Sequence, residues 1–275
     1  MLELPEIETL KRDLERDIAG RKIKSVDIKV LKTMPRHRTK KSFSDLVDGA
    51  KVVVVERIDL AIVLQLNNEH SIVIELLGDA SLSRVASKES TESGTALVFT
   101  FTQGGDLRVV DPGTDSQIAV VPTEELNDVL PNAGGLDLLA RPISWVIFER
   151  YMKSFDAPLK TVLTDPSAFV GIGDIYSDEI LFDAGLRFDR PANELSTQEL
   201  RRLYRSVVGI LYDAIKYRGV SLESRPFIDL TGAPGEYGDH LAVYGKDGDL
   251  SPRSRLPIEK AQFKGRTVYY CNTQV

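Results

Sequence analysis

The amino-acid sequence predicts an α+β protein, with an N-terminal β-sandwich flanked by helices, then a helical domain and a C-terminal β-hairpin. Three observations predict this class. The chain has 275 residues, which corresponds to about two domains at roughly 150 residues each. Its first half alternates short β-branched segments with turn signals such as Asn67-Asn68 and Gly104-Gly105. Its second half changes to apolar residues at the helical spacings of three and four.

The first half is expected to begin with a helix and to continue as strands. Pro5 suits a first helical turn, and Gly20 ends a run of apolar residues spaced three and four apart. The short β-branched segments that follow are typical of an antiparallel sandwich. They are Ile23–Val30, Val52–Val55, Leu60–Leu66, Ser71–Leu77, Ala96–Thr102, Leu107–Asp111 and Gln117–Val121. The polar segment Ala86–Gly94 is expected to form a loop.

The second half predicts helices and then a hairpin. Ser196 and Glu199 form a capping box that opens a long helix, and Gly219 ends it. Shorter helices are expected at Ser144–Lys153, Leu159–Leu163 and Asp174–Ala184. One strand of the hairpin is expected at Arg266–Cys271. The predicted domains are residues 1–130, 143–240 and 241–275, with the connection between the first two over Leu130–Pro142.

The charge of the whole chain argues against a strong nucleic-acid binder, but the charge is unevenly distributed. The net charge is −6 and the pI is about 5.3, whereas such binders are expected to be basic. Between Arg21 and Lys41, however, nine basic residues accompany one acidic residue, and between Ser251 and Arg266 five accompany one. Such patches fit a surface presented to a polyanion. The alternative is a set of solvated faces without a ligand.

The sequence predicts a cytoplasmic protein. The single cysteine, Cys271, cannot form an internal disulfide. The longest stretch without a charged residue, Ser93–Gly105, is too short to span a bilayer. The first eight residues contain three glutamates and no apolar run follows them, which does not fit a signal peptide.

Four motifs occur in a fixed order along the chain. They are Glu3-Leu4-Pro5-Glu6-Ile7-Glu8-Thr9, Gly171-Ile172-Gly173-Asp174-Ile175-Tyr176, Pro234-Gly235-Glu236-Tyr237 with Val243-Tyr244-Gly245 behind it, and Gly265-Arg266. Together they resemble the formamidopyrimidine-DNA glycosylase/endonuclease VIII family of base-excision repair enzymes, over essentially the whole chain. The resemblance implies a β-sandwich, a helix-two-turn-helix domain and a zinc-finger hairpin. It also implies DNA glycosylase and AP lyase activity on double-stranded DNA.

The resemblance implies an N-terminal proline as nucleophile, and this chain departs from that pattern. An α-amine suits the attack because a large neutral fraction exists near neutral pH. Leu2 stands at the proline position and is expected to leave Met1 in place. Glu3 matches the proton-transfer position, and Glu6 is also retained. Alternatively, both are first-turn carboxylates that interact with the helix dipole. Leu60, expected on a core strand, stands where the family has a lysine.

The loops that fill the base stack in similar enzymes are also altered. The matching segments are Leu76-Leu77-Gly78-Asp79-Ala80-Ser81 and Asp111-Pro112-Gly113-Thr114-Asp115-Ser116. Asp79 and Asp115 replace apolar side chains, and Gly113 replaces an arginine. Carboxylates are repelled by phosphate and poorly solvated inside a duplex, so these loops argue against base flipping.

The expected DNA-backbone contacts lie in the second half. The Gly-x-Gly turn before Asp174 offers backbone N–H groups to a phosphate. By resemblance, the candidate DNA-binding residues are Lys160, Gly173, Asp174, Tyr176 and Arg266. Asp174 replaces the family's asparagine and adds a negative charge. For Lys160 and Arg266, the alternative is an exposed basic residue with no specific role.

The C-terminal hairpin is expected to bind no zinc, so no cofactor is predicted. The family's four-cysteine spacing is kept, but its positions read Ser251, Ser254, Cys271 and Gln274. Serine and glutamine are poor zinc ligands. The zincless finger is expected to depend on strand pairing and apolar packing, with Cys271 as a small buried residue.

Three hypotheses follow for function. The first is a catalytically degenerate member of the family with residual or altered DNA binding. The second is an active DNA glycosylase/AP lyase that uses the Met1 amine, or Glu3 and Glu6 acting on water. The third is a protein-interaction module without a DNA role, supported by the acidic pI and by Asp174. A monomer is expected in each case.

Overall fold

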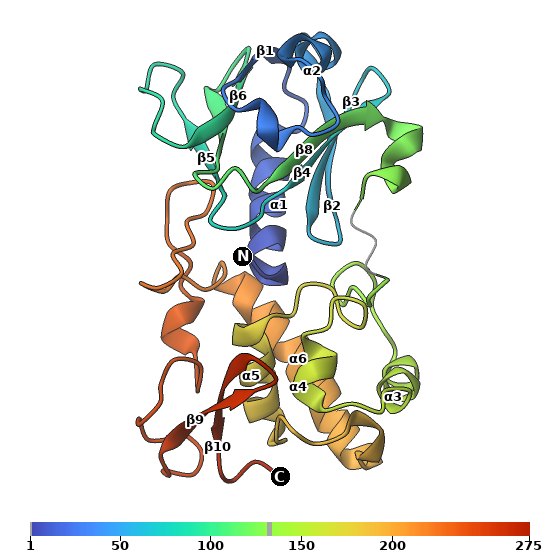
Figure 1. Cartoon of the computed structure of the whole chain (residues 1–275), viewed down its shortest axis with the longest axis vertical. Helices are drawn as coiled ribbons and strands as arrows, with labels where there is room; N and C mark the ends of the chain where they lie inside the picture. Colours follow the sequence, from blue (N-terminus) through green and yellow to red (C-terminus); the bar gives the residue numbers. More distant parts are fainter. Residues whose placement is uncertain (1, 131–133) are drawn as a thin grey trace. The chain divides into compact units, whose positions relative to one another are not determined.

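The computed structural model of the chain describes residues 2–130 and 134–275 (Figure 1). The chain forms two compact units, each described by itself below. The sandwich unit comprises Met1–Asn132 and Arg218–Glu236, and the helical unit comprises Ala133–Tyr217 and Tyr237–Val275. The Met1 amine and residues 131–133 of the expected connection lie outside the described residues.

The sandwich unit contains two four-stranded antiparallel sheets, which confirms the predicted architecture. One sheet has the order β1-β6-β7-β5 and the other the order β2-β3-β4-β8. The first sheet consists of β1 (Ile23–Ile28), β6 (Thr95–Phe101), β7 (Asp106–Val110) and β5 (Ser81–Val85). The second consists of β2 (Val52–Ile58), β3 (Ala61–Leu66), β4 (His70–Glu75) and β8 (Gln117–Pro122).

Helix α1 (Leu4–Ile18) runs beside β2 and buries the apolar stripe that its sequence predicts (Figure 1). The side chains of Ile7, Leu10, Leu14 and Ile18 are at most 1% exposed and join the core of the unit. Burial of each such side chain contributes about 1.5–3 kcal/mol, so the stripe fixes which face of α1 meets the sheet.

The short elements of the sandwich unit are α2 (Lys40–Val47) and two 3-10 helices, η1 (Leu31–Thr33) and η2 (Thr123–Asp128). The sequence analysis did not predict α2 or β5. Thr39 caps α2 by accepting a hydrogen bond from the Ser42 backbone N–H at 3.1 Å, and only Phe43 and Val47 of this helix are buried. Because only two of its eight residues are apolar and buried, the spacing of apolar residues is too sparse to predict a helix from the sequence.

The segment Arg218–Glu236 belongs to the sandwich unit, whereas the predicted helical domain extended to residue 240. Its Arg218 forms ion pairs with Asp13 on α1 and with Asp229. The Val220 backbone N–H donates to Glu6 of α1 at 2.9 Å. Carboxylates of α1 therefore hold a segment that follows a helix of the other unit in sequence.

The helical unit contains the predicted helices and the C-terminal hairpin. Its helices are α3 (Trp145–Lys153), α4 (Leu159–Leu163), α5 (Asp174–Ala184) and α6 (Thr197–Lys216), with the 3-10 helices η3 (Ala192–Glu194) and η4 (Tyr237–His240). Strands β9 (Ile258–Phe263) and β10 (Arg266–Cys271) pair antiparallel. The capping box of Ser196 and Glu199 is present. Among the described residues, none of the helices is both long and apolar enough for a bilayer crossing.

Candidate active site and nucleic-acid interface

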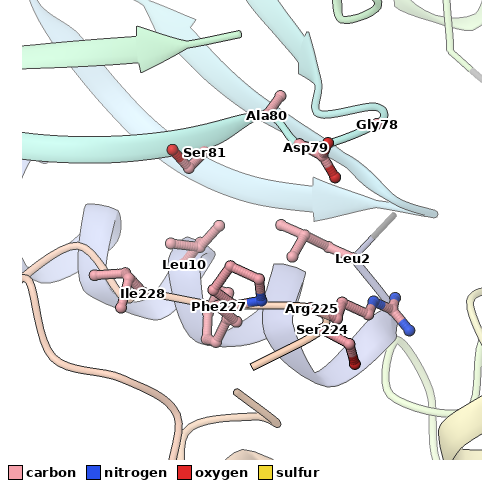
Figure 2. A pocket seen from close by; sticks show the side chains of 11 residues that line it. Leu2, Leu10, Gly78, Asp79, Ala80, Ser81, Ser224, Arg225, Phe227 and Ile228 are labelled. Carbon is pink, nitrogen blue, oxygen red and sulfur yellow. The ribbon is translucent and has the colours of Figure 1, made fainter. Parts of the chain in front are cut away.

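A cavity of about 330 Å³ lies beside the N-terminal end of α1 within the sandwich unit (Figure 2). Its apolar lining includes Leu2, Leu10 and Phe227, and its charged lining consists of Asp79 and Arg225. Figure 2 shows Leu2 facing this space between the loop of Asp79 and the segment that carries Arg225. The position that the resemblance assigns to the nucleophile therefore lies at a cavity, but it presents an isobutyl side chain there.

The two retained carboxylates of α1 are buried and hydrogen-bonded. Glu3 is 5% exposed, and its Oε1 lies 3.0 Å from Nη1 of Arg225. Glu6 is 3% exposed; its Oε2 accepts from the Glu3 backbone N–H at 3.0 Å and its Oε1 from Val220 N–H. Glu6 is thus an acceptor that joins α1 to the 218–236 segment, while Glu3 faces a cation at the cavity.

Leu60 lies in the turn between β2 and β3, not on the strand where it was expected. Ile58 pairs with Ala61, which leaves Asp59 and Leu60 as a two-residue hairpin turn, and Asp59 has a φ of 51°. The half-buried Leu60 side chain packs against the core. The neighbouring cation, Arg57, donates to Glu8 at 2.9 Å.

The two loops that the resemblance assigns to base flipping lie side by side. A Cβ atom added at Gly78 would come 2.9 Å from Oδ2 of Asp115. Buried Asp111 shapes the second loop, because its carboxylate accepts from the backbone N–H groups of Asp115 and Ser116. Asp79 and Asp115 are both exposed at this edge. Two carboxylates are thereby concentrated at the edge where the resemblance implies apolar side chains.

In the helical unit, the turn before α5 brings together most of the predicted DNA-binding residues. Gly173 is the N-cap of α5. Nη1 of Arg266 donates to Oδ1 of Asp174 at 3.0 Å, and Nζ of Lys160 lies 3.7 Å from the same oxygen. Arg266 is 45% exposed and Asp174 is 36% exposed. Arg266 and Asp174 are therefore open to solvent, and the Asp174 carboxylate lies near both cations.

Lys160 is not an exposed residue, which corrects the expectation for it, and Tyr176 is buried as well. Lys160 is 0% exposed, and its Nζ donates to Ser177 Oγ at 2.8 Å and to Asp178 Oδ1 at 2.6 Å. The Tyr176 side chain is also fully buried, and its ring packs against Tyr237. Both side chains lie in the interior of the helical unit, where neither is accessible to a phosphate in solvent.

Burial raises the pKa of Asp178 to about 7, although Lys160 opposes the shift. The carboxylate is also linked to the hairpin, because its Oδ2 accepts from the Tyr269 backbone N–H at 2.9 Å. The neighbouring Glu179 is buried as well and accepts three backbone N–H groups, from Ala242, Val243 and Tyr244. These three hydrogen bonds hold the backbone of the Val243-Tyr244-Gly245 motif against α5.

The four residues at the positions of the zinc pattern form hydrogen bonds with other groups of the protein. Ser254 Oγ lies 3.1 Å from the sulfur of Cys271. Gln274 accepts from the Cys271 backbone N–H at 2.7 Å and donates to Leu186 O at 2.8 Å. Ser251 is fully buried. Two hydroxyls, a thiol and an amide do not suit tetrahedral zinc, and the described residues contain no cluster of three metal-ligating side chains.

A β-sandwich joined to a helix-two-turn-helix unit with a terminal hairpin defines the glycosylase-type class of DNA repair folds. Residues 1–116 match the formamidopyrimidine-DNA glycosylase N-terminal domain, and residues 135–225 match the formamidopyrimidine-DNA glycosylase H2TH domain. The formamidopyrimidine-DNA glycosylase of Pelotomaculum thermopropionicum is 30% identical over 99% of this chain and 98% of its own length. That of Geobacillus kaustophilus is 31% identical, with 98% of both chains covered. The chain belongs to the formamidopyrimidine-DNA glycosylase family.

The solved structures agree on the fold. Fpg from Lactococcus lactis, in complex with abasic-site DNA, has a TM-score of 0.87 to this chain at 22% identity. The match covers 98% of this chain and 97% of that one. The resemblance stated from the motifs is thereby confirmed, as is the fold.

The sequence analysis did not identify two residues that form ion pairs with predicted site residues. Arg225, the partner of Glu3, lies 222 positions away along the chain in an irregular segment. Asp178, the partner of Lys160, is the fifth residue of α5. Almost every residue of α5 is buried, so no apolar face distinguishes Asp178 in the sequence, and no local pattern marks Arg225.

We predict that Lys160→Met lowers the free energy of unfolding by about 3–5 kcal/mol, because it leaves the Asp178 carboxylate buried without a cation. Asp178→Asn in the same chain should recover part of this loss. Loss of Lys160 raises the pKa of Asp178 above its wild-type value of about 7, so the deficit of Lys160→Met should be largest at alkaline pH, shrink as the pH falls toward about 7, and level off below it, where Asp178 is protonated in both proteins. Urea unfolding at several pH values measures both effects. A Lys160→Met protein as stable as the wild type would contradict the prediction.

A second prediction concerns Gly219, which has a φ of 84° and whose added Cβ would lie 2.9 Å from Glu6 Oε1. Gly219→Ala should be less stable than the matched control Gly232→Ala, where φ is 87° and no atom lies within 4 Å. Backbone strain of about 1–2 kcal/mol is common to both. The excess for Gly219→Ala, about 1–3 kcal/mol, measures the displaced Glu6 hydrogen bonds together with the crowding of the Phe227 ring, which lies 3.2 Å from the added Cβ. Equal unfolding midpoints would show that the Glu6 contact is unimportant.

Proposed function

We propose that this chain is a catalytically degenerate member of the family that binds double-stranded DNA but does not excise bases. One observation carries the proposal: the cavity beside α1 presents the Leu2 side chain, while Glu3 faces the guanidinium of Arg225 at 3.0 Å. A primary amine one residue out of register is badly placed for attack, and small misplacements cost large rate factors. Leu60 supplies no cation.

Binding of DNA is supported by the family and by the exposed cations. A relative named formamidopyrimidine-DNA glycosylase matches 99% of this chain, and the related L. lactis structure holds abasic-site DNA. Arg266 is half-exposed beside the N-terminus of α5, which favours anions. The segment from Arg21 to Lys41 adds nine basic residues, almost all exposed. These charges fit a phosphate backbone.

We also propose that the hairpin folds without zinc. Hydrogen bonds of Ser254 and Gln274 to Cys271, and apolar packing of Cys271 with Val243 and Ile258, take the place of a metal. The finger is then stable in the presence of a chelator.

We predict that sodium borohydride traps no covalent adduct between this protein and a duplex that contains an abasic site. Trapping requires an amine that attacks C1′ and forms an imine, which borohydride reduces. The matched variant Leu2→Pro restores the secondary amine after removal of Met1, and an adduct with this variant alone would locate the loss at residue 2. Gel electrophoresis measures the adduct.

The control is the intact mass of the N-terminus, which shows whether Met1 is present. An adduct with the wild-type protein that disappears after acetylation of the terminus would overturn the proposal. It would favour an active glycosylase/AP lyase with a non-proline nucleophile.

A further prediction is that Asp174→Asn tightens binding to duplex DNA roughly fivefold at low salt. Removal of one carboxylate near a phosphate is worth about 1 kcal/mol in a watery surrounding, and it frees Arg266. The matched control is Asp189→Asn, which removes an exposed carboxylate paired with Arg187 in the same unit. A gel shift between about 50 and 200 mM salt measures affinity and its salt dependence. Undetectable binding of all three proteins would refute a DNA role.

A further inference from the structure

A surface groove of about 650 Å³ lies within the helical unit, between the start of α3 and the first half of α6. It is lined by Trp145, Gln198, Arg201, Arg202, Tyr204 and Arg205. Three of its six lining residues are arginines, and none is acidic. The groove belongs to neither of the sites described above.

The three guanidinium groups are available to a ligand. Arg202 donates from Nε to Ala184 O at 3.0 Å, and Arg205 donates from Nε to Arg201 O at 3.4 Å. Within residues 134–275, the structure shows no ion pair or hydrogen bond for the Nη atoms of these arginines. Arg201 and Arg205 are exposed. Planar guanidinium groups with free Nη atoms suit carboxylates in bidentate pairs.

The aromatic floor of the groove is preorganised. Tyr204 donates from its hydroxyl to Ile143 O at 2.6 Å and packs on Phe148 with ring centroids 5.2 Å apart. Trp145 meets Tyr204 edge-on at 6.1 Å. The arginines therefore project from a surface that needs little ordering when a ligand binds.

Two exposed aliphatic residues follow Trp145 along α3, next in sequence to the groove lining but not part of it. Val146 and Ile147 follow Trp145 in the first turn of α3 and are 59% and 58% exposed. Large aliphatic side chains at such exposure, beside a cationic groove, are typical of an interaction surface.

We infer that the groove between α3 and α6 docks an acidic peptide segment of a partner protein, with carboxylates on the arginines and an apolar side chain against Val146 and Ile147. A peptide fits better than single-stranded nucleic acid, which needs a free aromatic face for its bases. Arg201 already lies over the Trp145 ring, with its guanidinium carbon 5.5 Å from the ring centroid, so one face of this ring is covered. The inference does not depend on the DNA-binding proposal.

The test uses the full chain and a fluorescein-labelled peptide that mixes Asp and Glu with Leu and Phe. The double variant Arg201→Gln/Arg205→Gln should weaken its binding at least about tenfold, since two carboxylate contacts are lost. Val146→Ser should weaken it about threefold. The matched control, Lys153→Gln/Lys216→Gln, removes the same charge from two exposed positions of the same unit that lie outside the groove lining and outside the basic segment 251–266, and it should leave the affinity unchanged.

Fluorescence anisotropy measures affinity, and thermal unfolding confirms that each variant is folded. A peptide in which Asn and Gln replace every acid should not bind. Equal weakening by both double variants would reveal nonspecific charge attraction and overturn the inference. Tighter binding of a short single-stranded oligonucleotide than of the peptide would also overturn it. Both results leave the duplex gel shift unaffected, so the two proposals fail independently.

Discussion

One buried positive charge organises the helical unit. The ammonium of Lys160 donates to Asp178, to Ser177 and to the backbone carbonyl of Asp174. Burial of an unpaired ammonium costs several kcal/mol, so these acceptors must be in place whenever the unit is folded. Asp178 extends the constraint to Tyr269 of β10. The turn before α5, the helix and the hairpin are consequently held in one arrangement, and Asp174 faces Arg266 as a result.

In the sandwich unit, buried negative charges rather than a buried positive charge hold distant segments together. Carboxylates of α1, those of Glu6 and Asp13, hold the segment 218–236 through Val220 and Arg218. At the candidate sites, Glu3, Lys160 and Asp174 are each paired with a charged group of their own unit. A charge that is already paired must lose its internal partner before it can serve a ligand, which weakens its action on that ligand.

Local patterns were sufficient for most of the fold. The apolar stripe of α1, the capping box of α6 and the order of the β-branched segments each depend on residues close together in sequence. The same patterns failed for α2 and β5, which are short and bury few side chains. They also assigned Leu60 to the strand, although β3 begins at Ala61. An apolar residue at the end of a turn cannot be distinguished by its type from the first residue of the strand that follows.

The sequence by itself determined the kinds of most elements and the family. Only the tertiary structure decided which charges meet. Lys160 was expected at the surface and is buried on Asp178, and Glu3 faces Arg225 across 222 positions of sequence. The physical reason is that periodicity reports how a residue relates to its own helix or strand. The partner of a buried charge depends on how segments far apart in sequence pack together, and a short stretch of sequence does not contain this information.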